Sequence, residues 1–272
     1  MSALQALTST LLILGALCGC AHAPSGGLTF GVLGDTPYTA GEVQRLDALI
    51  DDMNREKLDF VVHVGDIGAD ACSDVWLEAR KRQFARIRHP VVVIPGDNEW
   101  TDCRDPLGRL RAWRGFFCAP AFAVEVQKGE YCEHMRWVAG GFLFVTLNVA
   151  GSNNNVRNAA EHARRMAAVY AWLDESAVLA QKGRVGLVIL MQANPFITLP
   201  RDGYLELRER LIALGERMSG RLVLVHGDTH TYHDDEPLPG VRRLEVWGSP
   251  IVSWVRGEVE AGELRFSAPR YR

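Results

Sequence analysis

The sequence predicts a single α/β domain whose strands run largely parallel, and three observations support this prediction. Apolar, strand-like runs alternate with helix-like segments along most of the chain. Gly-Asp occurs four times, each time directly after an apolar run, and its aspartates are Asp35, Asp66, Asp97 and Asp228. The first three are spaced 31 residues apart, enough for a strand, a helix and two loops. Because parallel strands end at one edge of a sheet, we expect the four aspartates to gather there.

The individual elements follow from apolar periodicity and from capping residues. Strands are expected at residues 29–33, 59–64, 91–94, 142–147, 185–191 and 222–226. Thr39, Ser73 and Asp105 are typical N-caps for three helices, a long helix is expected over about residues 156–181, and another ends at 218. Residues 119–137 are the least regular section and are expected over the strand ends. Short antiparallel strands are expected at 243–247, 251–255 and 264–266.

Composition limits the classes of function. With 272 residues, 47% of them hydrophobic, the chain can bury a large core. The formal net charge is −3, and no basic run or basic-aromatic stripe occurs. A dedicated nucleic-acid-binding surface is therefore not expected.

The N-terminal segment has the features of an export signal. Residues 1–28 contain no Asp, Glu, Lys or Arg, and the apolar stretch 11–18 is too short to span a bilayer. The sequence Leu-Cys-Gly-Cys that ends at Cys20 resembles a bacterial lipobox, in which the last cysteine is lipidated. We therefore predict a signal peptide at 1–19, a tether at 20–28 and one domain at 29–272. The protein is expected in the periplasm, anchored through Cys20 to the outer membrane; the alternative is a disordered tail or a misassigned start.

Export also changes how the remaining cysteines are interpreted. Their spacing fits no zinc module, whereas an even number of cysteines suits an oxidising compartment. Cys72 and Cys103 each lie six residues beyond a Gly-Asp aspartate, on loops that leave neighbouring strands. We predict one disulfide between these two and a second, local one between Cys118 and Cys132.

A cluster of carboxylates at the strand ends requires compensation of its charge. Two unit charges about 4 Å apart repel by about 4 kcal/mol at an effective dielectric constant near 20. Protonation or a bound cation relieves this repulsion. Because His230 follows Asp228 by two residues, a metal site is the leading hypothesis.

The series GDT, GDI, PGDNE and GDTH resembles the motifs of the calcineurin-like metallophosphoesterases, in their order and over nearly all of residues 29–266. The family pattern is D-x-H, G-D-x, G-N-H-[DE], a later histidine, and G-H-x-H. The resemblance implies a four-layer αββα sandwich with two metal ions above the strand ends. On this basis Asp35 and Asp66 match two ligands, and His230 matches the last histidine.

Several positions depart from the family pattern. Pro37 stands where the D-x-H histidine is expected, so that ligand is absent. Asp97 replaces the metal-binding asparagine, and Asn98 replaces the histidine beside it. Gln192 falls where a ligand histidine is expected, and Asp228 replaces the first histidine of G-H-x-H.

The departures exchange nitrogen ligands for oxygen ligands. The implied donor set is Asp35, Asp66, Asp97, Gln192, Asp228 and His230. Such an oxygen-rich set favours one or two Mn²⁺ or Mg²⁺ ions over Zn²⁺.

The chemistry that the resemblance implies is in-line attack on phosphorus by a metal-bound hydroxide. The family histidine at the Asn98 position assists the leaving group, and an amide cannot deliver a proton there. His226 and His63 are the alternative acids, although each also suits a hydrogen-bonded strand histidine. Glu99 is expected to orient the turn from behind the ligands. Substrate contacts are expected from Asn148, Asn153 and Arg104, which also suit solvated loops.

Two classes of function remain open. The first is a metal-dependent phosphoesterase that acts on a phosphorylated small molecule, as an ester or an anhydride. The second is a metal-binding lipoprotein that retains the fold with weak turnover or none. Asp and Gln remain competent ligands, whereas drift more often leaves Ala, Ser or Leu, and this favours the enzyme.

Overall fold

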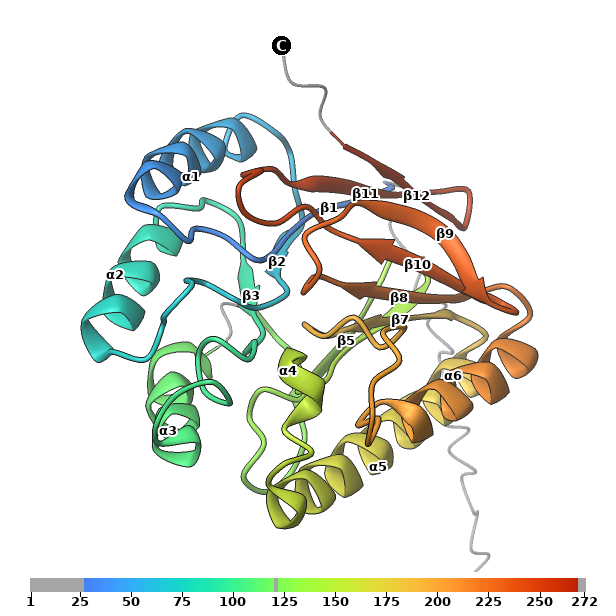
Figure 1. Ribbon diagram of the computed structural model, residues 1–272. Helices are drawn as coiled ribbons and strands as arrows, with labels where there is room; N and C mark the ends of the chain where they lie inside the picture. Colours follow the sequence, from blue (N-terminus) through green and yellow to red (C-terminus); the bar gives the residue numbers. More distant parts are fainter. Residues whose placement is uncertain (1–26, 120–121, 269–272) are drawn as a thin grey trace, which may run out of the picture.

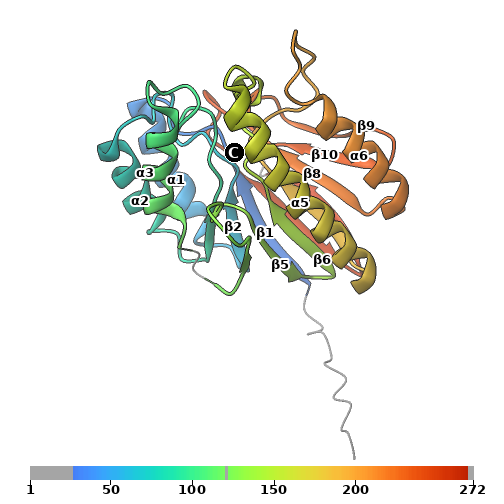
Figure 2. The same cartoon turned by 90° about the horizontal axis from the view of Figure 1, so that it is seen from below.

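A computed structural model describes residues 27–119 and 122–268, and it confirms the α/β prediction. Two sheets pack face to face, with helices outside each, which gives the four-layer αββα sandwich (Figures 1 and 2). The predicted signal peptide, the tether up to residue 26, and Cys20 lie outside the described residues. Within the described ranges, no helix is both long enough and apolar enough to cross a membrane.

The first sheet contains the strands that lead to three of the four Gly-Asp pairs. Its order is β12-β11-β1-β2-β3, and β1, β2 and β3 are parallel. The strands are β1 (Leu28–Leu33), β2 (Phe60–His63), β3 (Val91–Val93), β11 (Val255–Glu260) and β12 (Glu263–Ser267).

The second sheet has the order β4-β5-β6-β7-β8-β10-β9. Its central strands β6, β7, β8 and β10 are parallel, and they end at the same edge as β1 to β3 (Figure 1). The strands are β4 (Glu125–Val126), β5 (Met135–Ala139), β6 (Phe142–Thr146), β7 (Gly186–Leu190), β8 (Leu222–His226), β9 (His233–Leu238) and β10 (Val241–Glu245).

Three helices cover the first sheet and two long helices cover the second (Figure 2). The outer helices are α1 (Ala40–Met53), α2 (Asp74–Phe84), α3 (Pro106–Phe117), α5 (Ala159–Gly183) and α6 (Leu205–Met218), and the short turn α4 is Gly151–Asn154. The three predicted N-caps are confirmed, since Thr39, Ser73 and Asp105 each accept a hydrogen bond from the backbone three residues on.

The core between the sheets is aromatic. Phe30 of β1 stacks on Phe60 of β2, with ring centroids 5.1 Å apart, and both rings meet Phe144 of β6 edge to face. Two further apolar layers lie under α1 to α3 and under α5 and α6. The packing of these three apolar layers therefore fixes where the strand ends lie.

The C-terminal third differs from the predictions in three ways. Strand β10 was expected to pair antiparallel only, but it pairs in parallel with β8 and antiparallel with β9. Strand β9 itself was not predicted. The predicted strand at 251–255 is wrong, because residues 251–254 are irregular and β11 starts at Val255. In its place Val252 and Trp254 pack into the apolar layer beneath α1.

The section 119–137 does not cover the functional edge as a whole. Glu133 lies at the carboxyl end of β6, where it accepts hydrogen bonds from Thr146 and Asn148, but other residues of the section lie elsewhere. In its described part, Phe122 and Trp137 line a hollow together with Asp59, which precedes β2. This hollow is therefore at the opposite end of the strands. Both predicted disulfides, Cys72–Cys103 and Cys118–Cys132, are present.

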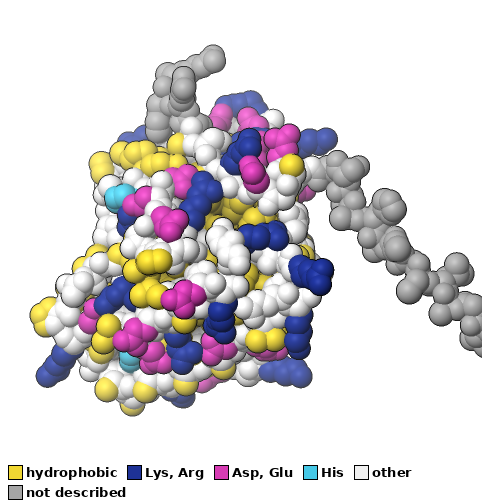
Figure 3. Space-filling model, turned by 90° about the vertical axis from the view of Figure 1, so that its right-hand side faces the viewer, with side chains coloured by type: hydrophobic (Ala, Val, Ile, Leu, Met, Phe, Trp, Pro, Cys, Tyr) yellow, Lys and Arg dark blue, Asp and Glu magenta, His cyan; other side chains and the backbone are white. Residues whose placement is uncertain are grey.

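The side of the molecule formed by β9 and α6 carries interspersed basic and acidic side chains (Figure 3). Arg242 pairs with Asp234 at 2.8 Å, and Arg210 pairs with Glu206 at 2.9 Å. Exposed pairs of this kind add little stability.

Candidate metal centre

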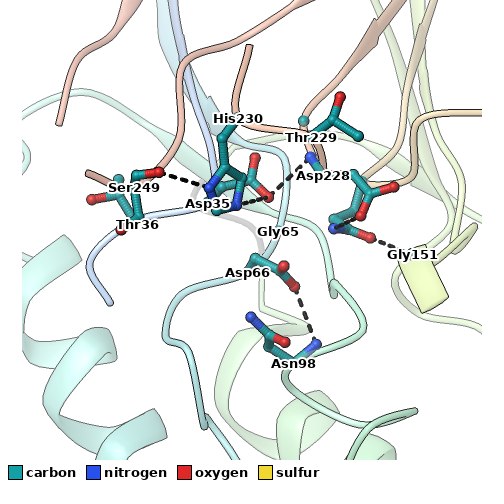
Figure 4. A network of polar contacts seen from close by, with 12 residues as sticks. Asp35, Thr36, Gly65, Asp66, Asn98, Gly151, Asp228, Thr229, His230 and Ser249 are labelled. Atoms are coloured by element: carbon teal, nitrogen blue, oxygen red, sulfur yellow. Dashed lines mark hydrogen bonds and ion pairs between the residues drawn. The ribbon is translucent and has the colours of Figure 1, made fainter. Parts of the chain in front are cut away.

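The four Gly-Asp aspartates follow strands of both sheets, and the structure brings them to one edge. Figure 4 shows Asp35, Asp66 and Asp228 at this edge. Asp35, Asp66 and Asp97 are buried, and Asp228 is half-buried. The backbone N–H of Asp228 donates to Asp35 Oδ1 at 3.0 Å, so one hydrogen bond joins the ends of the two sheets. The sequence prediction that these groups gather is therefore matched by the geometry.

The glycines of these motifs make room for the carboxylates. A methyl group at Gly96 would lie 2.0 Å from Asp66 Oδ1, and one at Gly227 would lie 1.9 Å from Asp35 Oδ2. Each glycine thus accommodates the aspartate of a different motif. This close approach gives a physical reason for the repeated Gly-Asp, beyond the tight turn itself.

The aspartates also adopt an unusual backbone conformation. Asp35, Asp66 and Asp228 have φ values of 50°, 57° and 81°, and His230 has 60°. Left-handed backbone costs energy for residues other than glycine, least for Asp and Asn. Such strain is concentrated at functional sites, because the surrounding structure must hold it in place. Here it turns the chain abruptly after each strand.

Asp97 and Asp228 face each other across Gly151. A methyl group on Gly151 would lie 2.5 Å from an oxygen of each carboxylate, so those two oxygens are at most twice that distance apart. Ser152 donates to Asp97 Oδ2 at 2.8 Å. The Gly151 N–H donates to Gln192 Oε1, and the Gln192 amide lies 3.5 Å from Asp228 Oδ1.

His230 is oriented by its backbone surroundings. Its Nδ1 lies 2.7 Å from the carbonyl oxygen of Ser249, which can only accept a hydrogen bond (Figure 4). Nδ1 therefore carries a proton, and Nε2 faces Asp35 Oδ1, 3.8 Å away. A backbone carbonyl that fixes the ring in this way is typical of metal-binding histidines.

Asp66 is held by two residues of neighbouring loops. The Tyr38 hydroxyl donates to Asp66 Oδ2 at 2.8 Å, and the backbone N–H of Asn98 donates to Asp66 Oδ1 at 3.2 Å. The Asn98 amide in turn donates to the Tyr38 oxygen at 3.0 Å. Burial and the nearby Asp66 charge raise the pKa of Tyr38 far above its usual range, so this phenol keeps its proton.

Glu99 lies behind the site and fixes two loops. Its carboxylate accepts backbone N–H bonds from Asp66, Ile67 and Gly96, at 3.1, 2.7 and 2.6 Å. Burial nevertheless raises the pKa of Glu99 to about 7. The position agrees with the expected supporting role.

The unpaired charge of the site fits divalent cations. Asp35 Oδ2 and Asp97 Oδ1 are buried without a hydrogen-bond partner, and in the described ranges no Lys or Arg pairs with any of the four aspartates. Within the described residues, the four carboxylates do not form a tight cluster. Among residues 27–119 and 122–268, only Cys118, Cys132 and Glu133 bring three ligand-type side chains within 4.8 Å, and those two sulfurs are bonded to each other.

Burial is the main cause of the raised pKa values of the carboxyl groups. Burial, then the charge of Asp97, raises the pKa of Asp228 to about 7. Burial and the neighbouring carboxylates raise the pKa of Asp35 and of Asp66 well above the ordinary value, and burial raises that of Asp97. The site therefore binds protons when no cation compensates its charge.

This proton binding predicts how stability depends on pH. A raised folded-state pKa gives stability that is complete below the unfolded pKa near 4 and is lost as the pH rises through about 7. Between about pH 5 and pH 8, the melting temperature of chelator-treated protein should fall by at least roughly 5 °C, since 1 kcal/mol corresponds to about 2–4 °C. Saturating Mn²⁺ should reverse the fall, and Asp228→Asn should reduce it. Calorimetry that shows a melting temperature rising over this range would contradict the carboxylate cluster.

The other predicted residues lie in different surroundings. His226 is fully buried, its Nδ1 donates to the Gly227 carbonyl oxygen at 2.8 Å, and burial lowers its pKa to about 3. Arg243, His233 and Asp235 act on its pKa electrostatically. His63 uses both ring nitrogens, on the Thr36 carbonyl and the Gly65 N–H. The structure therefore gives no support to either histidine as the acid.

The three residues predicted to contact the substrate lie in different parts of the structure. Asn148 is buried and donates to Glu133 at 2.9 Å, inside the fold. The Asn153 side chain makes hydrogen bonds with the backbone of Arg201 and Gly203, and so joins its own turn to the loop after residue 200. Arg104 is exposed in the connection between β3 and α3.

Two residues near the carboxylates were not predicted. Tyr38 lies three residues after Asp35, one position beyond the missing histidine at Pro37, so its place on the loop was the available signal. Ser152 belongs to a polar loop, and nothing in the sequence alone connects it to Asp97.

Comparisons with known proteins agree with this geometry. A model of the family described as calcineurin-like phosphoesterase matches residues 18–246. Among solved structures, the chain is similar to a dimetal phosphatase from Danio rerio, with 15% identity, a TM-score of 0.66, and coverage of 89% of this chain and 95% of that chain. It is also similar to GAP50, the anchor in the inner membrane complex of Plasmodium, with 12% identity, a TM-score of 0.58, and coverage of 89% and 84%.

A third similar structure is the purple acid phosphatase PPD1 from yellow lupin (Lupinus luteus). It shares 16% identity and a TM-score of 0.53; the match covers 90% of this chain and 52% of the lupin chain. At these identities the structural similarities establish the fold alone. No curated protein sequence matches the chain.

Proposed function

The chain belongs to the calcineurin-like phosphoesterase family, and from this membership we propose that it is a hydrolase that cleaves a phosphate ester or anhydride with divalent cations. The observation that carries the proposal is the buried, uncompensated charge at the strand ends. Among the residues that the structure describes, Asp35 Oδ2 and Asp97 Oδ1 have no hydrogen-bond partner, although burial of a lone carboxylate is costly. A buried carboxylate oxygen without a hydrogen-bond partner is suited to bind a cation.

We propose that the cations are held by both sheets. The residues are those predicted from the motifs: Asp35, Asp66, Asp97, Gln192, Asp228 and His230. Five oxygen donors and one imidazole favour Mn²⁺ or Mg²⁺ over Zn²⁺. When bound, such cations activate water and neutralise charge on the phosphoryl oxygens.

The protein's own residues prepare the site for this chemistry. Tyr38 and the Asn98 backbone fix both oxygens of Asp66, and Glu99 holds the loops on either side. The amide of Asn98 can donate a hydrogen bond to a leaving group but cannot give up a proton. The proposed substrates therefore have leaving groups that depart without a general acid.

Tyr38→Phe should weaken Mn²⁺ binding. The change removes the hydroxyl that orients Asp66 and leaves the ring in place, and loss of such supporting contacts typically costs roughly 10–100-fold in metal affinity. Calorimetric titration measures the dissociation constant directly. Tyr232→Phe is a matched control, because the Tyr232 hydroxyl makes no hydrogen bond to the described residues while its ring stacks on Trp247. Equal affinities of the two variants would contradict the role of Tyr38.

A binding protein with this fold is the second candidate function. The absent histidines at Pro37 and Asn98 favour it, because they remove a ligand and a proton donor. A turnover screen separates the two candidates. Purified protein would be tested on phosphomonoesters and phosphodiesters with Mn²⁺, with Mg²⁺ and with chelator. If the protein is an enzyme, it should turn over at least one substrate and should require metal to do so. Metal binding without turnover of any substrate would support the binding protein.

We further propose export and anchoring through a lipid on Cys20. Ala21, which follows it, is not an acidic inner-membrane retention signal, so the outer membrane is the expected destination. Mass spectrometry of protein isolated from membranes should find a diacylated or triacylated N-terminal Cys20. An unmodified N-terminus, or one beyond Cys20, would reject the lipoprotein hypothesis.

A further inference from the structure

A hollow of about 500 Å³ lies beside the carboxylate site. Its walls come from three segments: residues 101–102 after β3, the turn and loop 152–157 that includes most of α4, and the loop 199–201. Ser152 lines the hollow and also donates a hydrogen bond to Asp97. The hollow and the carboxylate site are therefore separated by one side chain.

Two arginines of this hollow have no partner. Arg157 and Arg201 are exposed, and within the described residues neither guanidinium makes an ion pair or a hydrogen bond. Most other arginines around the fold are paired, as Arg208 is with Asp202 and Arg114 with Glu133. The acid on the opposite wall, Asp102, is already engaged by Ser152 at 3.0 Å.

The loop that carries Arg201 is fixed to the turn that carries Ser152. Asn153 donates to the Arg201 carbonyl at 3.0 Å and accepts from the Gly203 N–H at 2.8 Å. Ser152 and Asn153 both have positive φ, so this turn is held in a costly conformation. These contacts fix the backbone of Arg201 relative to the turn whose Ser152 hydroxyl donates to Asp97.

We propose that this hollow binds a second anionic group of the substrate, of phosphoryl type, apart from the phosphoryl group that reacts. Guanidinium groups bind phosphoryl oxygens in a planar, two-pronged geometry, and two of them outweigh the single acid of the hollow. The apolar wall formed by Val156, Leu199 and Pro200 suits the part of the substrate that joins the two groups. The inference rests on the proposed phosphoesterase function and adds the substrate class.

The test uses inert ligands with one or two anionic groups. Alkyl monophosphonates and α,ω-bisphosphonates with about three to about eight methylene groups would be titrated into the Mn²⁺-loaded protein, since a divalent ligand gains affinity when its linker spans both sites. At one linker length the bisphosphonate should bind at least about tenfold more tightly than the monophosphonate, equivalent to about 1.4 kcal/mol. The variant Arg157→Gln/Arg201→Gln should lose this advantage.

Arg88→Gln is the matched control, because Arg88 is exposed, its side chain has no partner in the described ranges, and it precedes β3 at the other end of the strands. It should keep the full advantage. The inference would be overturned if no bisphosphonate binds more tightly than the monophosphonate, or if the double variant keeps the gain in affinity. Either result together with metal-dependent turnover of p-nitrophenyl phosphate would leave the proposed function intact. Absence of both turnover and monophosphonate binding would instead refute the function itself.

Discussion

Asp66→Asn should reduce kcat/KM for p-nitrophenyl phosphate by at least roughly 10³-fold, more than the 10–100-fold typical of residues that only support a ligand. Asp66 is buried between Asp35 and Asp97, and both contribute to its raised pKa. Hydrogen bonds from the Tyr38 hydroxyl and the Asn98 backbone N–H orient its two carboxylate oxygens. The amide replaces one carboxylate oxygen by a nitrogen with no negative charge, so it cannot compensate a cation.

Asp70→Asn is the matched control for this prediction. Asp70 lies on the same loop after β2, is exposed, and contacts no other described side chain through a hydrogen bond or ion pair. It should retain the kinetics and the Mn²⁺ response of the unmodified protein. Asp66→Asn that keeps full turnover would show that the reaction does not use this edge of the sheets.

The second large effect concerns the leaving group. With Asn98 in place of a proton donor, aryl phosphates and anhydrides should react about 10²–10⁴-fold faster than alkyl esters, the range that general-acid catalysis typically contributes. Rates over a series of substituted phenyl esters should fall steeply as the pKa of the phenol rises. Asn98→His should flatten this dependence, because the imidazole can protonate the departing oxygen.

His226 offers a contrast within the same experiment. It is buried and bonded to the Gly227 carbonyl, so His226→Gln should leave the slope of the series unchanged. A slope near zero in the unmodified protein, with the chemical step limiting the rate, would mean that another group supplies the proton.

Strands that end in Gly-Asp could be predicted because burial and turn chemistry are both local signals. The runs before Asp35, Asp66 and Asp228 are apolar on both faces, as expected for strands between two layers. The caps at Thr39 and Ser73 are likewise set by a side chain and the backbone three residues on. Local chemistry therefore determined most of the parallel core.

The polar edge of the second sheet could not be predicted in this way. Strand β9 reads HDDEPL and is largely exposed, so it has neither apolar alternation nor β-branched residues. Charged residues and proline are common at the edge of a sheet, where they discourage pairing with other chains. Such a strand is formed by its pairing with β10 rather than by its own sequence.

The supporting contacts of the site depend on tertiary structure. Gly151 approaches Asp97 and Asp228 from a loop that is distant in sequence, and Tyr38 reaches Asp66 across 28 residues. The motifs identified the aspartates, but not that Gly96 and Gly227 make room for carboxylates of other motifs. The placement of His226 away from the aspartates likewise follows from which face of β8 it occupies.

A Mn²⁺ titration of chelator-treated protein tests the central proposal most directly, with heat of binding and p-nitrophenyl phosphate turnover recorded on the same samples. Turnover should be absent without metal and should rise in step with occupancy of the site. Asp66→Asn should lose both signals, whereas Asp70→Asn should keep both. Turnover that persists in the presence of chelator, or Mn²⁺ binding that is unaffected by Asp66→Asn, would contradict a metal-dependent phosphoesterase built on these carboxylates.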